Sequence, residues 1–320
     1  MSVSRLTLAG IRLADVLLLP AVALAGLVLR LVRRLSLGRM PVSRAVLKRI
    51  GVLPVRNHYY EPYVDVTALR SPLNEPRVLP GIDWNVGGQL RLLSELNFAT
   101  ELHDLATAAG TYAFRFDNGS FESGDAEFLY QIIRARKPRR VIEVGSGHST
   151  RIAGRALRMN QQESAGYTFE HICIEPYENP WLESLAVQVL RQKVEDVDAA
   201  VFAKLLADDL LFIDSSHVIR PQGDVLAEYL RILPLLMPGV IVQVHDIFSP
   251  RDYLHEWVAD NQWLWNEQYL LEAFLTENPS WEIIGALNFL HHEHRAQLQQ
   301  VCPYLTPDRE PGSFYMRKRT

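Results

Sequence analysis

From about residue 123 onward, short apolar, β-branched runs alternate with stretches of helical character. This alternation is typical of βαβ units that build a sheet covered by helices. The predicted strands are Arg140–Val144, Phe169–Ile174, Ala186–Leu190, Leu210–Ile213, Val240–Val244, Trp281–Gly285 and Ser313–Arg317. Helices are predicted at residues 125–135, 150–159, 224–236 and 267–277. Seven strands with interleaved helices predict an α/β fold with one doubly wound sheet.

The first third of the chain has a different pattern. Residues 16–29 are a run of 14 uncharged residues, about 21 Å long as a helix. Residues 51–83 carry turn signals every few positions and predict an irregular, packed connector, whereas the leucine spacing over residues 88–108 predicts a helix. We therefore divide the chain into an apolar and basic arm (1–50), a cap region (51–119) and an α/β domain (120–320).

Charge separates the arm from the rest of the chain. Residues 1–56 carry ten Lys and Arg side chains against Asp15 alone, so an overall charge of −4 leaves about −13 for the remainder. An acidic body argues against nucleic acid as a partner, since phosphate binding needs a basic face. Cys173 and Cys302 form neither a disulfide framework nor a zinc spacing, which indicates a reducing compartment.

Three interpretations of the apolar run stay open at this stage. It is a membrane attachment, which spans the bilayer if Asp15 and Arg30 snorkel and otherwise lies in its interface; a buried helix of the fold; or a cleaved signal peptide. More arginines follow the run than precede it, so membrane attachment through residues 1–40 predicts a cytoplasmic body at the inner face of the membrane.

The first predicted strand runs directly into a glycine-containing loop, with the sequence Glu143-Val-Gly-Ser-Gly-His-Ser-Thr150. Glycines at alternate positions let the backbone approach a ligand closely, and the following helix offers free N–H groups. Thr150 replaces the last glycine of a dinucleotide fingerprint, which disfavours a nicotinamide enzyme. A tight turn without a ligand is the alternative for this motif alone.

Acidic residues end three later strands. Glu175 follows the second, Asp214 the fourth, and His245-Asp246 the fifth. The carboxyl ends of parallel strands are where open α/β sheets place their ligands, and a carboxylate there can accept both ribose hydroxyls of a nucleoside. The pattern predicts a nucleoside site.

The segments IEVGSGHST, FIDSSHV, VHDIF and WNEQYLL resemble class I S-adenosylmethionine-dependent methyltransferases, in particular the bacterial methyltransferase family 24-like group. The resemblance covers roughly residues 120–320 and implies a mostly parallel seven-stranded sheet whose last strand is antiparallel. It implies S-adenosylmethionine as cofactor. The cofactor-binding residues that it implies are Glu143, Gly145, Ser146, Gly147, His148, Ser149 and Glu175, with Ser149 in place of that family's third glycine.

Catechol-type O-methyltransferases of the same superfamily bind a divalent cation after the fourth and fifth strands and use a nearby lysine as base. Aligned without gaps, this implies Asp214, His245 and Asp246 as ligands of Mg²⁺ or Mn²⁺, with His217 in place of the lysine. An imidazole can take a hydroxyl proton at neutral pH. A histidine that only hydrogen-bonds a backbone carbonyl is the alternative for His217.

The resemblance implies methyl transfer, and we expect the acceptor to be an oxygen of a small-molecule, glycan or lipid-linked compound. Trp257, Trp263, Trp265 and Tyr269 are candidates for an acceptor pocket, although aromatic residues at such positions also serve as core. The competing hypothesis is a non-catalytic, membrane-tethered scaffold that keeps the nucleoside-binding fold. The acceptor and the oligomeric state stay open.

Overall fold

The computed structural model describes residues 5–107, 113–177 and 179–319. The chain divides into two compact units, Met1–Leu69 and Arg70–Thr320. The division lies inside the segment 51–119, which the sequence analysis treats as one cap region.

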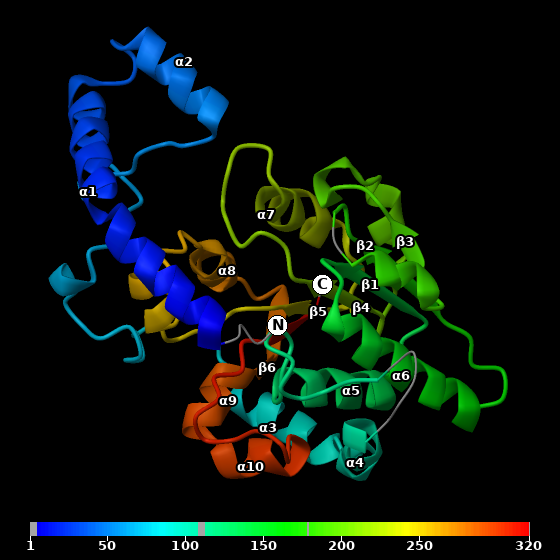
Figure 1. The fold of residues 1–320 in the computed structure, drawn as a ribbon. Coiled ribbons are helices and arrows are strands. Elements are labelled where there is room, and N and C mark those ends of the chain that lie inside the picture. Colours follow the sequence, from blue (N-terminus) through cyan, green and yellow to red (C-terminus); the bar gives the residue numbers. More distant parts are fainter. Residues whose placement is uncertain (1–4, 108–112, 178, 320) are drawn as a thin grey trace. The chain divides into compact units, whose positions relative to one another are not determined.

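The second unit is built on a seven-stranded sheet with the order β3-β2-β1-β4-β5-β7-β6. Helices surround the sheet (Figure 1). The strands are β1 (Arg140–Val144), β2 (Glu170–Ile174), β3 (Gln188–Leu190), β4 (Leu210–Ile213), β5 (Ile241–Val244), β6 (Trp281–Ala286) and β7 (Phe314–Lys318). Strand β7 runs antiparallel to both of its neighbours, and the remaining pairs are parallel. The predicted doubly wound, mostly parallel sheet is confirmed.

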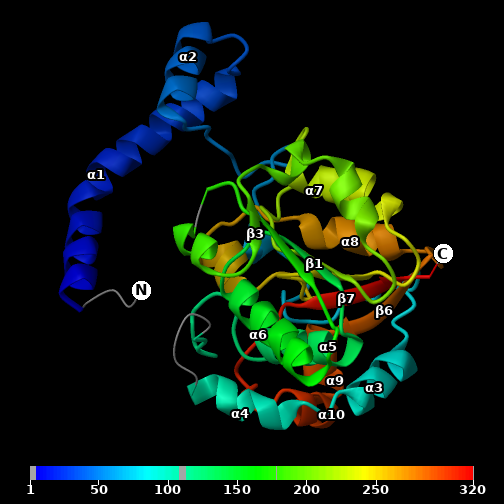
Figure 2. The same cartoon turned by 90° about the vertical axis from the view of Figure 1, so that its right-hand side faces the viewer.

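Helices cover both faces of the sheet (Figure 2). One face carries α3 (Val86–Glu95), α4 (Ala99–Thr107), α5 (Asp125–Arg136), α6 (His148–Glu163), α9 (Leu287–Glu293) and α10 (Arg295–Val301). The other carries α7 (Asp224–Ala227), which continues as a π-turn (Glu228–Ile232) and a 3₁₀ turn (Leu233–Leu235), and α8 (Glu267–Leu275). A sheet buried between two helical layers needs apolar side chains on both faces, which explains its uninterrupted apolar strands.

Strand β4 illustrates this two-sided burial. Leu210 and Phe212 pack in the core on the α5 side, whereas Leu211 and Ile213 pack in the core on the α7 side. Successive side chains of a strand point to opposite faces, so the run Leu-Leu-Phe-Ile contributes two side chains to each core.

One predicted helix is divided into two helices in the structure. The predicted helix over residues 88–108 is broken between α3 and α4, where the backbone N–H of Phe98 donates to the side chain of Gln131 at 2.9 Å. This bond to a residue of α5 replaces the helical one, and leucine spacing alone does not reveal it.

The first unit contains α1 (Arg5–Leu35), α2 (Pro41–Ile50) and one 3₁₀ turn (Val66–Ala68). Helix α1 runs through Pro20 without a break. Its stretch Thr7–Leu35 is long and apolar enough to cross a membrane, with a mean hydropathy of 2.2 in its 18-residue window. Only 6% of that window is buried, so the interpretation as a buried core helix is not supported by the structure.

The second unit should fold without the first. Val32 is the only residue of the first unit, among those described, that belongs to the buried apolar set, whereas both core clusters of the sheet lie within residues 82–316. We expect a chain of residues 70–320 to melt within about 3 °C of the full-length protein, because little of the buried apolar area is lost. Thermal unfolding followed by circular dichroism measures this. Aggregation or a much lower melting temperature of residues 70–320 would contradict it.

Candidate cofactor and proton-transfer site

Gly145 sits where three strand ends meet. Its backbone N–H donates to Ile174 O at the end of β2, and the N–H of Asp214 after β4 donates to Val144 O. The φ of Gly145 is +76°, and a Cβ at this position would lie 1.9 Å from the carbonyl oxygen of Asp214. Only glycine fits such a backbone approach. The motif glycine thus lets β1 and β4 come together at their carboxyl ends.

Glu143 holds the glycine loop through hydrogen bonds. The carboxylate is buried in β1 and accepts hydrogen bonds from the hydroxyls of Ser149 and Thr150, both at 2.9 Å. Its other oxygen lies 2.5 Å from Nε2 of His171. Thr150 Oγ1 also accepts from the N–H of Gly147 at 3.1 Å. Residues that replace the expected glycines therefore tie the loop to a buried carboxylate.

A pocket of about 600 Å³ opens at the carboxyl ends of β1, β2 and β4. Among the predicted cofactor residues, Gly145 and Glu175 line it, and Asp214 lines it as well. Glu175 accepts the N–H of Ser146 at 3.3 Å, which joins the loop to the end of β2. The size of the pocket is in the usual range for ligand pockets, and the position of the pocket is the one expected for a nucleoside in an open α/β sheet.

Two polar atoms of the loop are buried without a hydrogen-bond partner among the described residues. They are Oγ of Ser146 and Nδ1 of His148. Burial and the charge of Arg151 lower the pKa of His148, so its ring is neutral at pH 7. Buried polar atoms without partners cost free energy, and a polar ligand that pairs with them would recover it. The loop therefore fits a cofactor with polar groups. The hydroxyl of Ser149, in contrast, already donates a hydrogen bond to Glu143.

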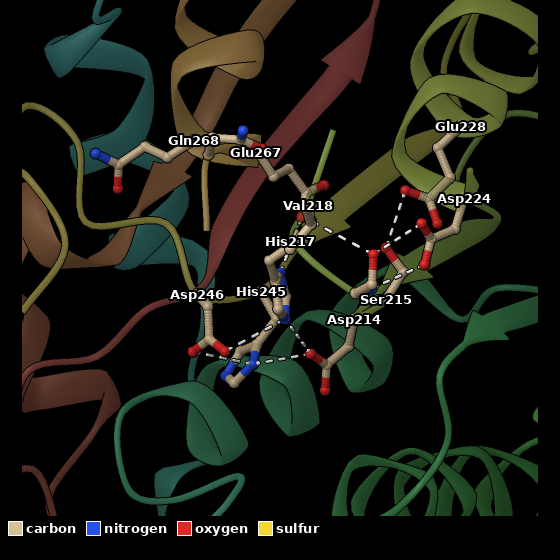
Figure 3. Close-up of polar contacts among 12 residues, drawn as sticks. Asp214, Ser215, His217, Val218, Asp224, Glu228, His245, Asp246, Glu267 and Gln268 are labelled. Carbon is tan, nitrogen blue, oxygen red and sulfur yellow. Dashed lines mark hydrogen bonds and ion pairs between the residues drawn. The ribbon is translucent and has the colours of Figure 1, made fainter. Parts of the chain in front are cut away.

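A cluster of histidines and carboxylates adjoins this pocket (Figure 3). Nε2 of His217 lies 3.3 Å from Oδ1 of Asp214 and 3.5 Å from Oδ2 of Asp246, while its Nδ1 pairs with Glu267 at 2.9 Å. Nδ1 of His245 lies 3.5 Å from Asp214 and 3.4 Å from Asp246. The two aspartates thus face both imidazoles.

Protonation in this cluster follows from its charges. Burial lowers the pKa of His217, but hydrogen bonds to Asp214 and Glu267 and the charge of Asp246 raise it well above the ordinary value. The pKa of His245 is likewise raised, by Asp246 and Asp214, against the effect of burial. Burial alone would raise the pKa of Asp214, but the charge of His245 and the hydrogen bond from His217 lower it. Burial raises the pKa of Asp246, although the charges of His245 and His217 act in the opposite direction. Both rings therefore carry protons when no cation is bound, and a protonated His217 cannot act as a general base.

The cluster also has the donor atoms for a cation. Asp214, His217 and Asp246 each place one ligand atom within 4.8 Å of the others. This group differs from the predicted ligand set in that His217, the predicted base, takes the place of His245. Carboxylate oxygens with one imidazole suit Mn²⁺ and, with more oxygen ligands, Mg²⁺.

The backbone is strained at both strand ends that carry this cluster. His217 and Asp246 each have a φ of +57°, which is unusual for residues with a Cβ. Such conformations cost on the order of 1 kcal/mol and concentrate where side chains must be aimed at a site. Both side chains here point into the cluster.

The sequence analysis missed several acidic members of the site. Glu267, at the start of α8, holds His217; Asp125, at the start of α5, lies 3.8 Å from Nε2 of His245; and Glu195 lines the pocket after β3. Glu195 lies five residues beyond the end of β3, so the strand-end rule used for Glu175 does not select it. Glu267 and Asp125 are brought in by helix packing, for which the sequence carries no signal.

The candidate acceptor aromatics gather only in part. The rings of Trp257, Trp263 and Trp265 lie within 4.5–5.1 Å of one another, and Trp265 lies 4.4 Å from the ring of His217. Tyr269 instead hydrogen-bonds Asp252. The role of the tryptophans in acceptor binding stays a prediction.

The sheet order, its single antiparallel strand and the acidic strand ends define a class I methyltransferase fold. Residues 142–247 match the methyltransferase 24 family, described as a methyltransferase domain. The recognition of this chain as a class I methyltransferase is thereby confirmed, and the match supports S-adenosylmethionine as the cofactor.

Other similarities are more distant. An uncharacterized protein of Archaeoglobus fulgidus is 25% identical over 177 residues, which are 51% of this chain and 78% of that protein. The crystal structure of a putative methyltransferase from Thermobifida fusca is 11% identical with a TM-score of 0.35, covering 61% of this chain and 79% of that one. The calicheamicin methyltransferase CalS11 is 11% identical with a TM-score of 0.39, covering 77% and 99%. Structural likeness at these TM-scores does not bear on the function.

Two glycines of the loop provide a matched test of its geometry. Gly145→Ala should destabilise the protein by about 3 kcal/mol or more, because its Cβ meets the Asp214 backbone and its φ is positive. Gly147→Ala should change stability by less than about 1 kcal/mol, since the nearest atom to its Cβ is 3.7 Å away. Urea unfolding of both variants measures the difference. Equal stabilities of the two variants would refute the assigned role of Gly145.

Proposed function

We propose that the second unit transfers the methyl group of S-adenosylmethionine to an oxygen of a small-molecule, glycan or lipid-linked acceptor. The observation that carries this proposal is the double position of Asp214. It lines the pocket assigned to the cofactor and also contacts both histidines of the neighbouring cluster. A cofactor site and a proton-transfer site thus share one residue.

S-adenosylmethionine supplies an activated methyl group on a sulfonium, so the protein has to align the acceptor and remove its proton. Gly145 and the Ser146 loop would hold the cofactor, and Glu175 would accept its ribose hydroxyls. The carboxylates of the neighbouring cluster would stabilise positive charge near the reacting oxygen.

His217 is proposed as the general base, with a condition set by its surroundings. The carboxylates around it favour its protonated form, so it accepts a proton only when their charge is compensated. A divalent cation held by Asp214 and Asp246 would supply that compensation and lower the pKa of a coordinated hydroxyl. His245, which faces both aspartates, would orient them or serve as a further ligand.

A non-catalytic scaffold is the second candidate function. It is favoured by the replacement of the third glycine at Ser149 and of the lysine at His217. The buried cluster argues against it, because a scaffold has no use for two strained residues and two charged histidines that cost stability. A protein that binds the cofactor but never transfers its methyl group would support the scaffold.

The first unit is proposed to attach the protein to the inner face of the membrane through residues 1–40, with the second unit in the cytoplasm. Helix α1 exposes its apolar side chains, and basic residues follow them. Helix α2 adds a second apolar surface: Val42, Val46 and Ile50, spaced by one turn, are 51–77% exposed, and Lys48 and Arg49 lie between them in sequence. Such a helix suits the headgroup region of a bilayer.

Cofactor recognition by Glu175 can be measured directly. Glu175→Ala should weaken S-adenosylmethionine binding at least tenfold, because a carboxylate that accepts two hydroxyls contributes about 1.5–3 kcal/mol. Glu170→Ala, at the opposite end of β2 and paired there with Arg140, should leave binding unchanged. Isothermal titration calorimetry compares the two variants. Preferential binding of NAD⁺, or no nucleoside binding by the intact protein, would overturn the proposal.

The cation and the base are separable by experiment. Mn²⁺ binding, followed by the electron paramagnetic resonance signal of the free ion, should weaken at least tenfold in Asp214→Asn and stay unchanged in Asp260→Asn, whose carboxylate is exposed. With an acceptor identified from metabolites that accumulate in a deletion strain, His217→Ala should lower kcat by 10²–10⁴-fold with unchanged cofactor affinity.

The outcomes discriminate between the two roles. Activity that survives EDTA but is lost in His217→Ala would contradict the proposed metal and support His217 as the base. Activity that survives both would make the cluster structural.

A further inference from the structure

A basic hollow lies within the first unit, apart from the methyltransferase site. Its volume is about 880 Å³, and its walls come from the last turns of α1 and from the segment that follows α2. Arg30, Arg34 and Arg56 line its basic side, and Gly26 and Leu29 line its apolar side. No acidic side chain lines this hollow among the residues that the structure describes, so no carboxylate in its walls compensates the charges of Arg30 and Arg34.

The hollow is held open by an ion-pair network. Arg33 binds Glu61 through two hydrogen bonds of 3.0 and 2.8 Å, and Arg56 reaches the same carboxylate at 3.2 Å. The side chain of Glu61 is only 6% exposed. One carboxylate thus anchors two guanidinium groups and fixes the 56–61 segment against α1. A bidentate, largely buried pair of this kind has defined geometry, unlike a loose surface ion pair.

Arg30 and Arg34 remain available. Neither has an ion-pair partner within the described part of the chain, and they are four residues apart, which places them on the same face of α1. Arginine recognises phosphate oxygens by paired N–H donors. Their charge therefore matches a phosphate.

The surroundings add a second requirement. Gly26 and Leu29 lie on the apolar side of the two arginines, and α1 continues from there as the exposed apolar run of residues 16–29. Arg12 and Arg30 flank that run 18 residues apart, about 27 Å along a helix, which is close to the thickness of the hydrocarbon core. In a bilayer the hollow would lie at headgroup depth, where a bound molecule is charged at one end and apolar at the other.

We propose that this hollow binds the phosphate headgroup of an anionic membrane phospholipid, whose acyl chains lie along α1. The proposal goes beyond the methyltransferase activity and rests on the proposed membrane attachment. Arg30 and Arg34 hold the phosphate, Arg56 completes the basic wall, and Leu29 contacts the start of the lipid chains.

The test uses the full chain in uncharged detergent micelles and counts bound lipid by native mass spectrometry. The probes are dioctanoylphosphatidylglycerol, dioctanoylphosphatidylcholine and inorganic phosphate. One phosphatidylglycerol should bind per chain, with phosphatidylcholine and inorganic phosphate at least tenfold weaker. Arg30→Gln with Arg34→Gln should weaken phosphatidylglycerol binding at least tenfold. The matched control, Arg44→Gln with Arg49→Gln, removes the same charge from exposed positions of α2 outside the hollow and should change it less than twofold.

Several results would overturn the headgroup site. Equal losses in the two double variants would assign binding to diffuse charge, and inorganic phosphate as tight as the lipid would make the hollow a site for a free anion. Absence of one-to-one binding would remove the site altogether. Flotation of the full chain with phosphatidylcholine vesicles tests membrane attachment separately: a chain that floats but binds no phosphatidylglycerol refutes the hollow alone, and one that does not float refutes the attachment.

Discussion

The approach of the Gly145 backbone to the carbonyl of Asp214 is the contact on which the candidate site depends. It is so close that no other residue fits at position 145, and the hydrogen bonds on either side of it join the ends of β2, β1 and β4. The pocket and the charged cluster both begin at this junction. Glu143 stabilises it from within the sheet, so the loop is held by a buried carboxylate and two hydroxyls rather than by a further glycine.

The charged cluster shows how burial and charge act against each other. Removing imidazoles from water favours their neutral forms, yet each ring here faces several carboxylates and keeps its proton. A buried array of this kind is a poor way to gain stability, since apolar packing of similar volume is often equally favourable. The left-handed conformations of His217 and Asp246 add to this cost. These costs support the proposal that the cluster serves proton and cation chemistry.

The two units follow different physical rules. The second buries apolar side chains on both faces of its sheet and is organised by strand register. The first exposes nearly all of its apolar side chains and is organised by one buried carboxylate that holds two arginines. Such a surface is unfavourable in water and favourable in a bilayer, so the surroundings of the first unit decide its stability.

The sequence by itself determined the order of the strands and helices along the chain, the class of the fold, the glycine loop and the acidic strand ends. Each of these is a local pattern: apolar runs of strand length, glycines at a turn, and a carboxylate directly after a strand. It also separated the basic arm from the acidic body. Only the tertiary structure showed that Glu267 and Asp125, from two different helices, complete the histidine cluster. It alone showed that Glu143 hydrogen-bonds the glycine loop and that His217 is surrounded by carboxylates. These properties depend on distances between segments far apart in the chain, and pKa values depend on such distances rather than on neighbours in sequence.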